Sequence, residues 1–152
     1  MSMRDDLGDR MKAYEAVTKN TLIHRMPVVI RLDGKAFHTF TRGFKKPFDH
    51  VLMQTMRETM KYLCENIQNC VIGYCQSDEI SLLLVDYVTL DSMPWFGNKV
   101  EKMASVSASM ATFILNRAFE TNYRRWWIHT VAETNGDVSD DIQQIFDAYT
   151  KA

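Results

Sequence analysis

The sequence predicts one α/β domain of the α+β type, with an antiparallel sheet and helices on one of its faces. The length of 152 residues suits a single domain that can bury its own core. Hydrophobic residues make up 46% of the chain and charged residues 24%, as in ordinary globular proteins. Short β-branched runs alternate with longer stretches of helical periodicity, so strands and helices are expected to share that core.

The first half of the chain predicts a helix, a strand and a second helix. Residues 5–18 have the pattern of an amphipathic helix, and "PVVIRLDG" (27–34) predicts a buried strand that stops at Asp-Gly. The segment "TFTRGFKKPFD" (39–49) is typical of a loop, and Asp49 can cap the helix that follows. That helix has an apolar face formed by Leu52, Met56, Met60 and Leu63.

The second half begins with two strands. "CVIGYC" (70–75) and "EISLLLVDYV" (79–88) predict a hairpin, because "QSDE" (76–79) leaves room only for a tight turn. A long helix is predicted from Lys99 to about Phe119, and a last amphipathic helix over 140–152.

Residues 124–133, "RRWWIHTVAE", are either a strand or a continuation of the long helix, which "NGD" (135–137) would end. The "RRWW" part is either an RNA-stacking patch or apolar packing.

The element order brings distant carboxylates together. Strand–helix–strand–strand–helix is most of the ferredoxin-like split βαβ pattern, in which the third strand lies between the first two and antiparallel to both. The end of the first strand and the hairpin turn then meet at one edge of the sheet. We therefore expect Asp33 to lie near Asp78 and Glu79.

Carboxylates gathered at one edge repel one another unless a hard cation neutralises them. Mg²⁺ uses one or two carboxylates together with substrate phosphates, and two such ions serve in-line phosphoryl or nucleotidyl transfer. The alternative is that Asp33-Gly34 and Ser77-Asp78-Glu79 are turn sequences and nothing more.

Charge and cysteine content exclude several classes. A net charge of -1 offers no broad surface for nucleic acid, and no apolar run approaches the length of a membrane span. The polar N-terminus does not have the pattern of a signal peptide, which indicates a cytoplasmic location. The three cysteines, Cys64, Cys70 and Cys75, form neither a disulfide framework nor a zinc pattern, and are expected to be free thiols.

Three segments, "RLDGKAFHTFTRGFKKPFD", "YCQSDEISLLL" and "NKVEKMASVSASMATFILN", closely resemble the tRNA-histidine guanylyltransferase (Thg1) family and its Thg1-like relatives. The resemblance spans roughly Leu22 to Phe119 and implies a polymerase-palm domain that adds nucleotides to a tRNA 5′ end in the 3′-to-5′ direction. It implies that ATP activates the 5′ end by adenylylation and that the 3′-hydroxyl of GTP then displaces AMP.

The resemblance also assigns the site. By it, Asp33 bridges two Mg²⁺ ions, the Gly34 carbonyl binds one of them, and Asp78 is the second carboxylate ligand. Glu79 completes the catalytic carboxylates. The implied nucleotide contacts are Asp33, Gly34, Lys35, Ala36, Phe37, His38, Lys46, Ser77, Asp78, Lys99 and Lys102.

Three of these positions carry a qualification. Lys99 stands where the family usually has arginine, so the bidentate fork is missing there. For Lys46 the alternative is a solvated loop lysine, and for His38 it is a packed histidine.

Later family motifs, "FDAR" and "HxxNN", are absent. We therefore expect residues 1–152 to form the N-terminal palm-like part of a longer protein, or a reduced relative. Such a chain should bind GTP or ATP while transferring little nucleotide, and we expect a homo-oligomer. The alternatives are a template-dependent tRNA 5′-end repair polymerase, a non-catalytic nucleotide-binding remnant and, with a poorer fit, a palm-type nucleotidyl cyclase.

Overall fold

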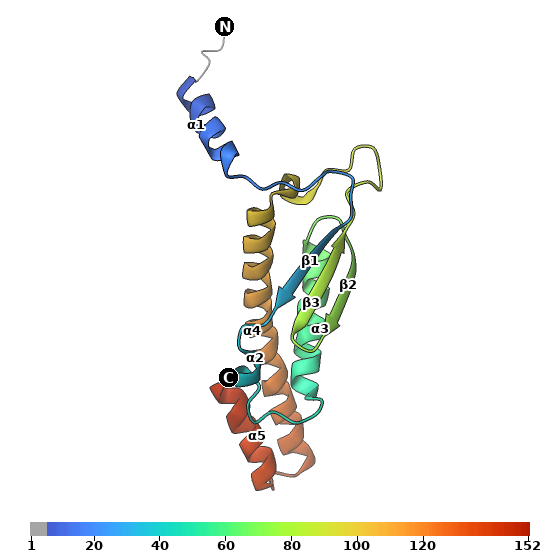
Figure 1. Ribbon diagram of the computed structural model, residues 1–152. Helices are drawn as coiled ribbons and strands as arrows, with labels where there is room; N and C mark the ends of the chain where they lie inside the picture. Colours follow the sequence, from blue (N-terminus) through green and yellow to red (C-terminus); the bar gives the residue numbers. More distant parts are fainter. Residues whose placement is uncertain (1–5) are drawn as a thin grey trace.

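The computed structural model describes residues 6–152. The elements are α1 (Asp6–Val17), β1 (Val28–Asp33), α2 (Phe37–Phe40), α3 (His50–Asn66), β2 (Cys70–Gln76), β3 (Glu79–Leu84), the 3₁₀ turn η1 (Trp95–Asn98), α4 (Val100–Glu133) and α5 (Asp140–Lys151). Helices α3 and α4 lie side by side against the three-stranded sheet, and α5 folds back along the lower part of α4 (Figure 1).

The sheet has the predicted topology. Its strand order is β1-β3-β2, and β3 is antiparallel to both neighbours. Within β3, Ile80, Leu82 and Leu84 are buried in alternation, because successive side chains of a strand point to opposite faces. These side chains and Met56, Leu63 and Met103 of the helices form the main core. The expected ferredoxin-like, palm-type arrangement with helices on one face is therefore confirmed.

A second, aromatic cluster joins the C-terminal helix to the body. Phe44, Val51, Phe119 and Tyr149 are all buried there. Trp127 of α4 stacks on Phe146 with ring centroids 4.1 Å apart, and Trp126 meets Tyr149 edge-on at 5.2 Å. The packing interpretation of "RRWW" is thus confirmed for both tryptophan rings, since each lies against an aromatic ring of α5.

The structure decides one alternative that the sequence left open and differs from the sequence prediction at two elements. Residues 124–133 continue α4 as a helix until Asn135 and Gly136 turn the chain with positive φ angles. Strand β3 ends at Leu84, not at residue 88, because β1 pairs no further than Val28↔Leu84. The loop predicted over residues 39–49 begins inside the short helix α2, which ends at Phe40.

Helix α1 forms, but it buries no residue and stands apart from the body (Figure 1). Its expected amphipathic packing is therefore not seen, and Asp5 of that prediction lies outside the described residues. No helix within residues 6–152 is long and apolar enough to cross a membrane.

Candidate functional site

The hairpin turn and the end of β1 meet as predicted. In the sheet register Glu79 lies opposite both Asp33 of β1 and Gln76 of β2. Only Ser77 and Asp78 remain to form the turn, and Ser77 adopts a left-handed conformation with a φ of 56°. The close turn places Asp78 beside the strand end that carries Asp33.

A pocket of about 290 Å³ opens at this edge of the sheet. Two carboxylates, Asp33 and Asp78, line it together with Gly34 and Lys35. Its walls come from the apolar side chains of β1, α2, β3 and the two long helices, namely Leu32, Phe37, Met56, Ile80, Ala108, Ala111 and Leu115. An apolar cleft with a few charged groups is the usual form of a small-molecule site.

Gly34 is required by a close approach within the loop that follows β1. A Cβ atom at this position would overlap the ring of Phe37, whose Cγ would lie 2.8 Å away. Ala36 then turns the chain with a φ of 54° and begins α2, whose Thr39 N–H donates to the Ala36 carbonyl at 2.8 Å.

Glu79 is held by a partner outside the pocket. Its carboxylate forms an ion pair with Arg31 of β1 and accepts a hydrogen bond from the Arg31 guanidinium, which raises the pKa of that guanidinium. Glu79 does not line the pocket. Two of the three expected carboxylates therefore face the pocket together, while the third pairs across the strands, and its catalytic role stays a prediction.

The loop before α3 forms a neighbouring pocket of about 420 Å³. Ser77 of the hairpin lies in its wall, opposite Pro47 and Phe48. Asp49 fixes this loop, because its carboxylate accepts the N–H groups of Leu52 at 2.9 Å and Lys45 at 3.0 Å. The predicted N-cap is thus confirmed. Lys46 belongs to the same loop and is exposed.

Two predicted nucleotide contacts lie elsewhere. Lys99 and Lys102 line a separate pocket at the start of α4, together with Lys19 and other residues near the end of α1. The Lys102 ammonium group also lies 4.9 Å from the centre of the Phe96 ring. The structure therefore does not bring these lysines into the Asp33–Asp78 pocket, because α4 begins at the opposite end of the sheet.

Two further predicted nucleotide contacts, Phe37 and His38, belong to the short helix α2. His38 is exposed on this short helix, so the alternative of a packed histidine is wrong.

Three residues that line the pocket from α3 and α4, Thr59, Thr112 and Asn116, were not predicted from the sequence. The signal for them is helical spacing, since Ala108, Thr112 and Asn116 recur every four residues on one face of α4.

The carboxylates of this pocket suit Mg²⁺, which substrate phosphates help to bind, better than a metal ion held by protein side chains alone. Within residues 6–152, no three His, Cys, Asp or Glu side chains gather closely enough to hold a metal ion. Asp33 and Asp78 both line the pocket, and Mg²⁺ takes one or two carboxylates of this kind when substrate phosphates complete its coordination.

Comparison with known proteins decides the family. The family model described as tRNAHis guanylyltransferase matches residues 8–151. The chain belongs to the Thg1 family. Among curated members it is 32% identical over 102 residues to the human probable tRNA(His) guanylyltransferase, covering 66% of this chain and 30% of that protein. It is 29% identical over 113 residues to the Saccharomyces cerevisiae tRNA(His) guanylyltransferase, covering 72% of this chain and 42% of that protein.

Solved Thg1-like structures share the fold at higher identity. A bacterial Thg1-like protein in complex with GTP is 50% identical with a TM-score of 0.70, and the match covers 75% of this chain and 54% of that one. The complex of a bacterial Thg1-like protein with ATP gives 48% identity and a TM-score of 0.72, covering 78% and 52%. The chain thus spans 30% and 42% of the length of these two curated relatives and about half of each solved chain.

Proposed function

We propose that this Thg1 family chain carries the nucleotide site of a Mg²⁺-dependent tRNA guanylyltransferase. The supporting observation is the pocket in which Asp33 and Asp78, 45 positions apart, lie with Gly34 and Lys35 at the sheet edge. Bacterial Thg1-like proteins with the same fold bind GTP and ATP. The substrate in this proposal is a tRNA 5′ end, with GTP as the nucleotide added.

Each group has a defined task in the proposed reaction. Asp33 and Asp78 would hold the cations, and the main chain from Asp33 to His38 would approach the phosphates. Lys35 and Lys46 offset phosphate charge, and Ser77 contacts the nucleotide. When bound, two Mg²⁺ ions stabilise the in-line transition state of nucleotidyl transfer. The 3′-hydroxyl of GTP attacks the activated 5′ phosphorus, and AMP leaves.

A second candidate is template-dependent repair of tRNA 5′ ends. Its support is the resemblance to Thg1-like relatives, for which the sequence predicts this alternative activity. The chain is about half identical to bacterial Thg1-like proteins and 32% identical to the human probable tRNA(His) guanylyltransferase. Addition to tRNAs other than tRNA(His), directed by the opposite strand of the acceptor stem, would distinguish this activity from guanylylation of tRNA(His) alone. A homo-oligomer stays a prediction for both.

The test compares metal-dependent nucleotide binding in matched variants. Isothermal calorimetry with GTP should show binding that requires Mg²⁺, and Asp78→Asn should abolish most of it, because half of the carboxylate charge facing the cations is removed. Asp91→Asn, a change in the exposed loop at the far end of β3, should leave it unchanged. Labelled GTP with a tRNA(His) transcript then measures transfer. Equal GTP binding in the Asp78 variant and the unmodified chain would refute the assignment.

A further inference from the structure

A further pocket, of about 330 Å³, lies between α3 and α4 beyond the nucleotide site. Its polar lining consists of His50 and Gln54 from α3 and Asn122, Arg125, Trp126 and His129 from α4. All six side chains carry N–H groups, and no carboxylate lines the pocket. Such a surface suits an anion.

Helical spacing explains why these donors gather. His50 and Gln54 are four positions apart, and Asn122, Arg125 and His129 follow at intervals of three and four. Each set occupies one face of its helix, and α3 and α4 pack along their length. The continuation of α4 beyond Phe119 therefore creates this pocket.

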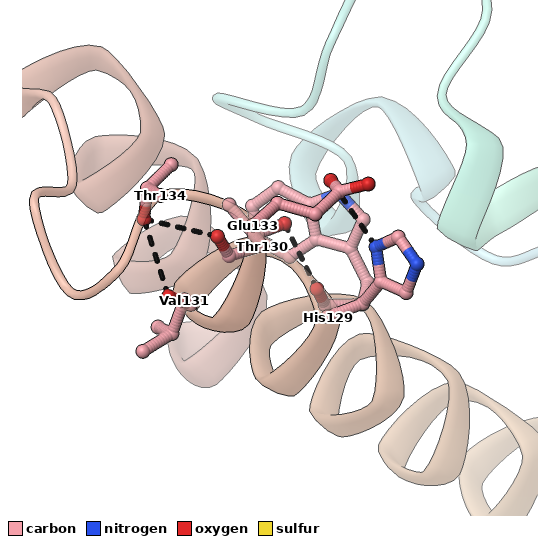
Figure 2. Close-up of polar contacts among 6 residues, drawn as sticks. His129, Thr130, Val131, Glu133 and Thr134 are labelled. Carbon is pink, nitrogen blue, oxygen red and sulfur yellow. Dashed lines mark hydrogen bonds and ion pairs between the residues drawn. The ribbon is translucent and has the colours of Figure 1, made fainter.

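The carboxylates nearby already have donors. Glu58 accepts the Gln54 amide at 2.9 Å and the Asn122 amide at 3.0 Å, one on each oxygen. Glu133 pairs with Nδ1 of His129 at 3.2 Å (Figure 2). The Glu133 contact leaves Nε2 as the His129 ring atom that can reach a ligand.

Arg125 has no partner for its charge among residues 6–152. Its neighbour Arg124 pairs with Glu120 at 2.6 Å, whereas Arg125 makes no ion pair or side-chain hydrogen bond within residues 6–152. A guanidinium presents a planar fork of donors that matches two oxygens of one phosphate. The pocket thus combines an unpaired arginine with the His50 imidazole, which can donate to the same group.

We propose that this pocket holds a backbone phosphate of the RNA substrate; this inference rests on the proposed function. Arg125 lies nine residues beyond Asn116, which lines the nucleotide pocket. That separation is about 14 Å along a helix axis, or about four stacked nucleotides of one strand. The pocket therefore positions a strand whose 5′ end lies at the Asp33–Asp78 site.

Fluorescence anisotropy with a labelled tRNA(His) transcript tests the proposal, over about 50–200 mM salt. Arg125→Gln should weaken binding roughly tenfold and lower the slope of log affinity against log salt by about one. Arg124→Gln is the matched control and should change both values little, because its charge is already paired. Circular dichroism and GTP calorimetry should be unchanged in both variants.

Several outcomes would overturn the proposal. One is equal RNA affinity and salt slope in the Arg125 variant and the unmodified chain, and another is equal losses in the two arginine variants. No RNA binding by the unmodified chain at the lowest salt would also overturn it. Loss of free ATP binding without loss of RNA binding would make the pocket a second nucleotide site instead. Failure of the proposed function is seen separately, as absence of Mg²⁺-dependent GTP binding.

Discussion

The Tyr149 hydroxyl donates a hydrogen bond to the Asp49 carboxylate at 2.7 Å, across 100 residues of sequence. Both side chains are buried. The same carboxylate caps α3 and holds the Lys45 N–H, so one bond links the C-terminal helix to the loop beside the nucleotide pocket. Through this bond, helix α5 stabilises the loop that carries Lys46.

Removing this hydroxyl should destabilise the fold. Tyr149→Phe keeps the ring in the aromatic cluster but deletes a buried bond to a charged acceptor, which costs about 1.5–3 kcal/mol in the free energy of unfolding. Urea denaturation should show a lower midpoint at constant slope. Tyr14→Phe, at a residue that is 64% exposed, is the control and should have no effect. Identical midpoints for the two variants would show that the Asp49 contact contributes nothing.

Stability should fall at alkaline pH. Burial raises the pKa of the Cys70 thiol from 9.0 to about 11, with a further contribution from its hydrogen bond with Cys64. Because the folded pKa is the higher one, the stabilisation is complete below about pH 9 and is lost between about 9 and 11. Burial and the Asp49 contact raise the pKa of Tyr149 as well, which acts in the same direction.

Denaturation at a series of pH values from 8 to about 10.5 measures this decline. Cys70→Ala should lose less free energy of unfolding over that range than the unmodified chain, because only Tyr149 then contributes. A Cys75→Ala control should keep the full decline. Parallel curves for the unmodified chain and the Cys70 variant would contradict the assignment to this thiol.

Gly73 allows β2 to lie close against α3. A Cβ atom there would overlap the Cys64 sulfur and lie 2.9 Å from Cγ of Met60. Gly73→Ala should therefore cost about 1–3 kcal/mol in the free energy of unfolding, through overpacking. Combining it with Cys64→Ala should recover part of that loss, since the second change provides room. Thermal unfolding of the two single variants and the double variant gives the coupling, and strictly additive losses would argue against a direct contact.

Gly34→Ala should impair nucleotide binding more than folding. The added methyl group must displace the Phe37 ring, which forms a wall of the nucleotide pocket. Strain of about 1–3 kcal/mol at this site corresponds to a loss of GTP affinity of roughly 5- to 150-fold. Ala36→Gly, two residues away, should preserve binding because glycine accepts the left-handed φ at that position. GTP calorimetry on both variants is the measurement, and unchanged affinity in Gly34→Ala would show that the Phe37 wall is not used.

The sequence by itself determined the sheet and the meeting of its two key carboxylates. The β-branched run before Asp33, the alternation after Glu79 and the short "QSDE" link allow one pairing, and a strand shifted by one residue would expose its core side chains. The order β1-β3-β2 then follows from chain connectivity. These are local or topological properties, which sequence periodicity carries.

Tertiary structure alone decided which cationic and amide side chains meet in the pocket between α3 and α4. Residues 124–133 fit either a strand or a helix, and packing of Trp126 and Trp127 against α5 accompanies the helical form. That choice set Arg125 and His129 opposite His50, while the start of α4 kept Lys99 and Lys102 away from Asp33. Side chains on different elements meet according to how helices pack, and no spacing within one segment contains that information.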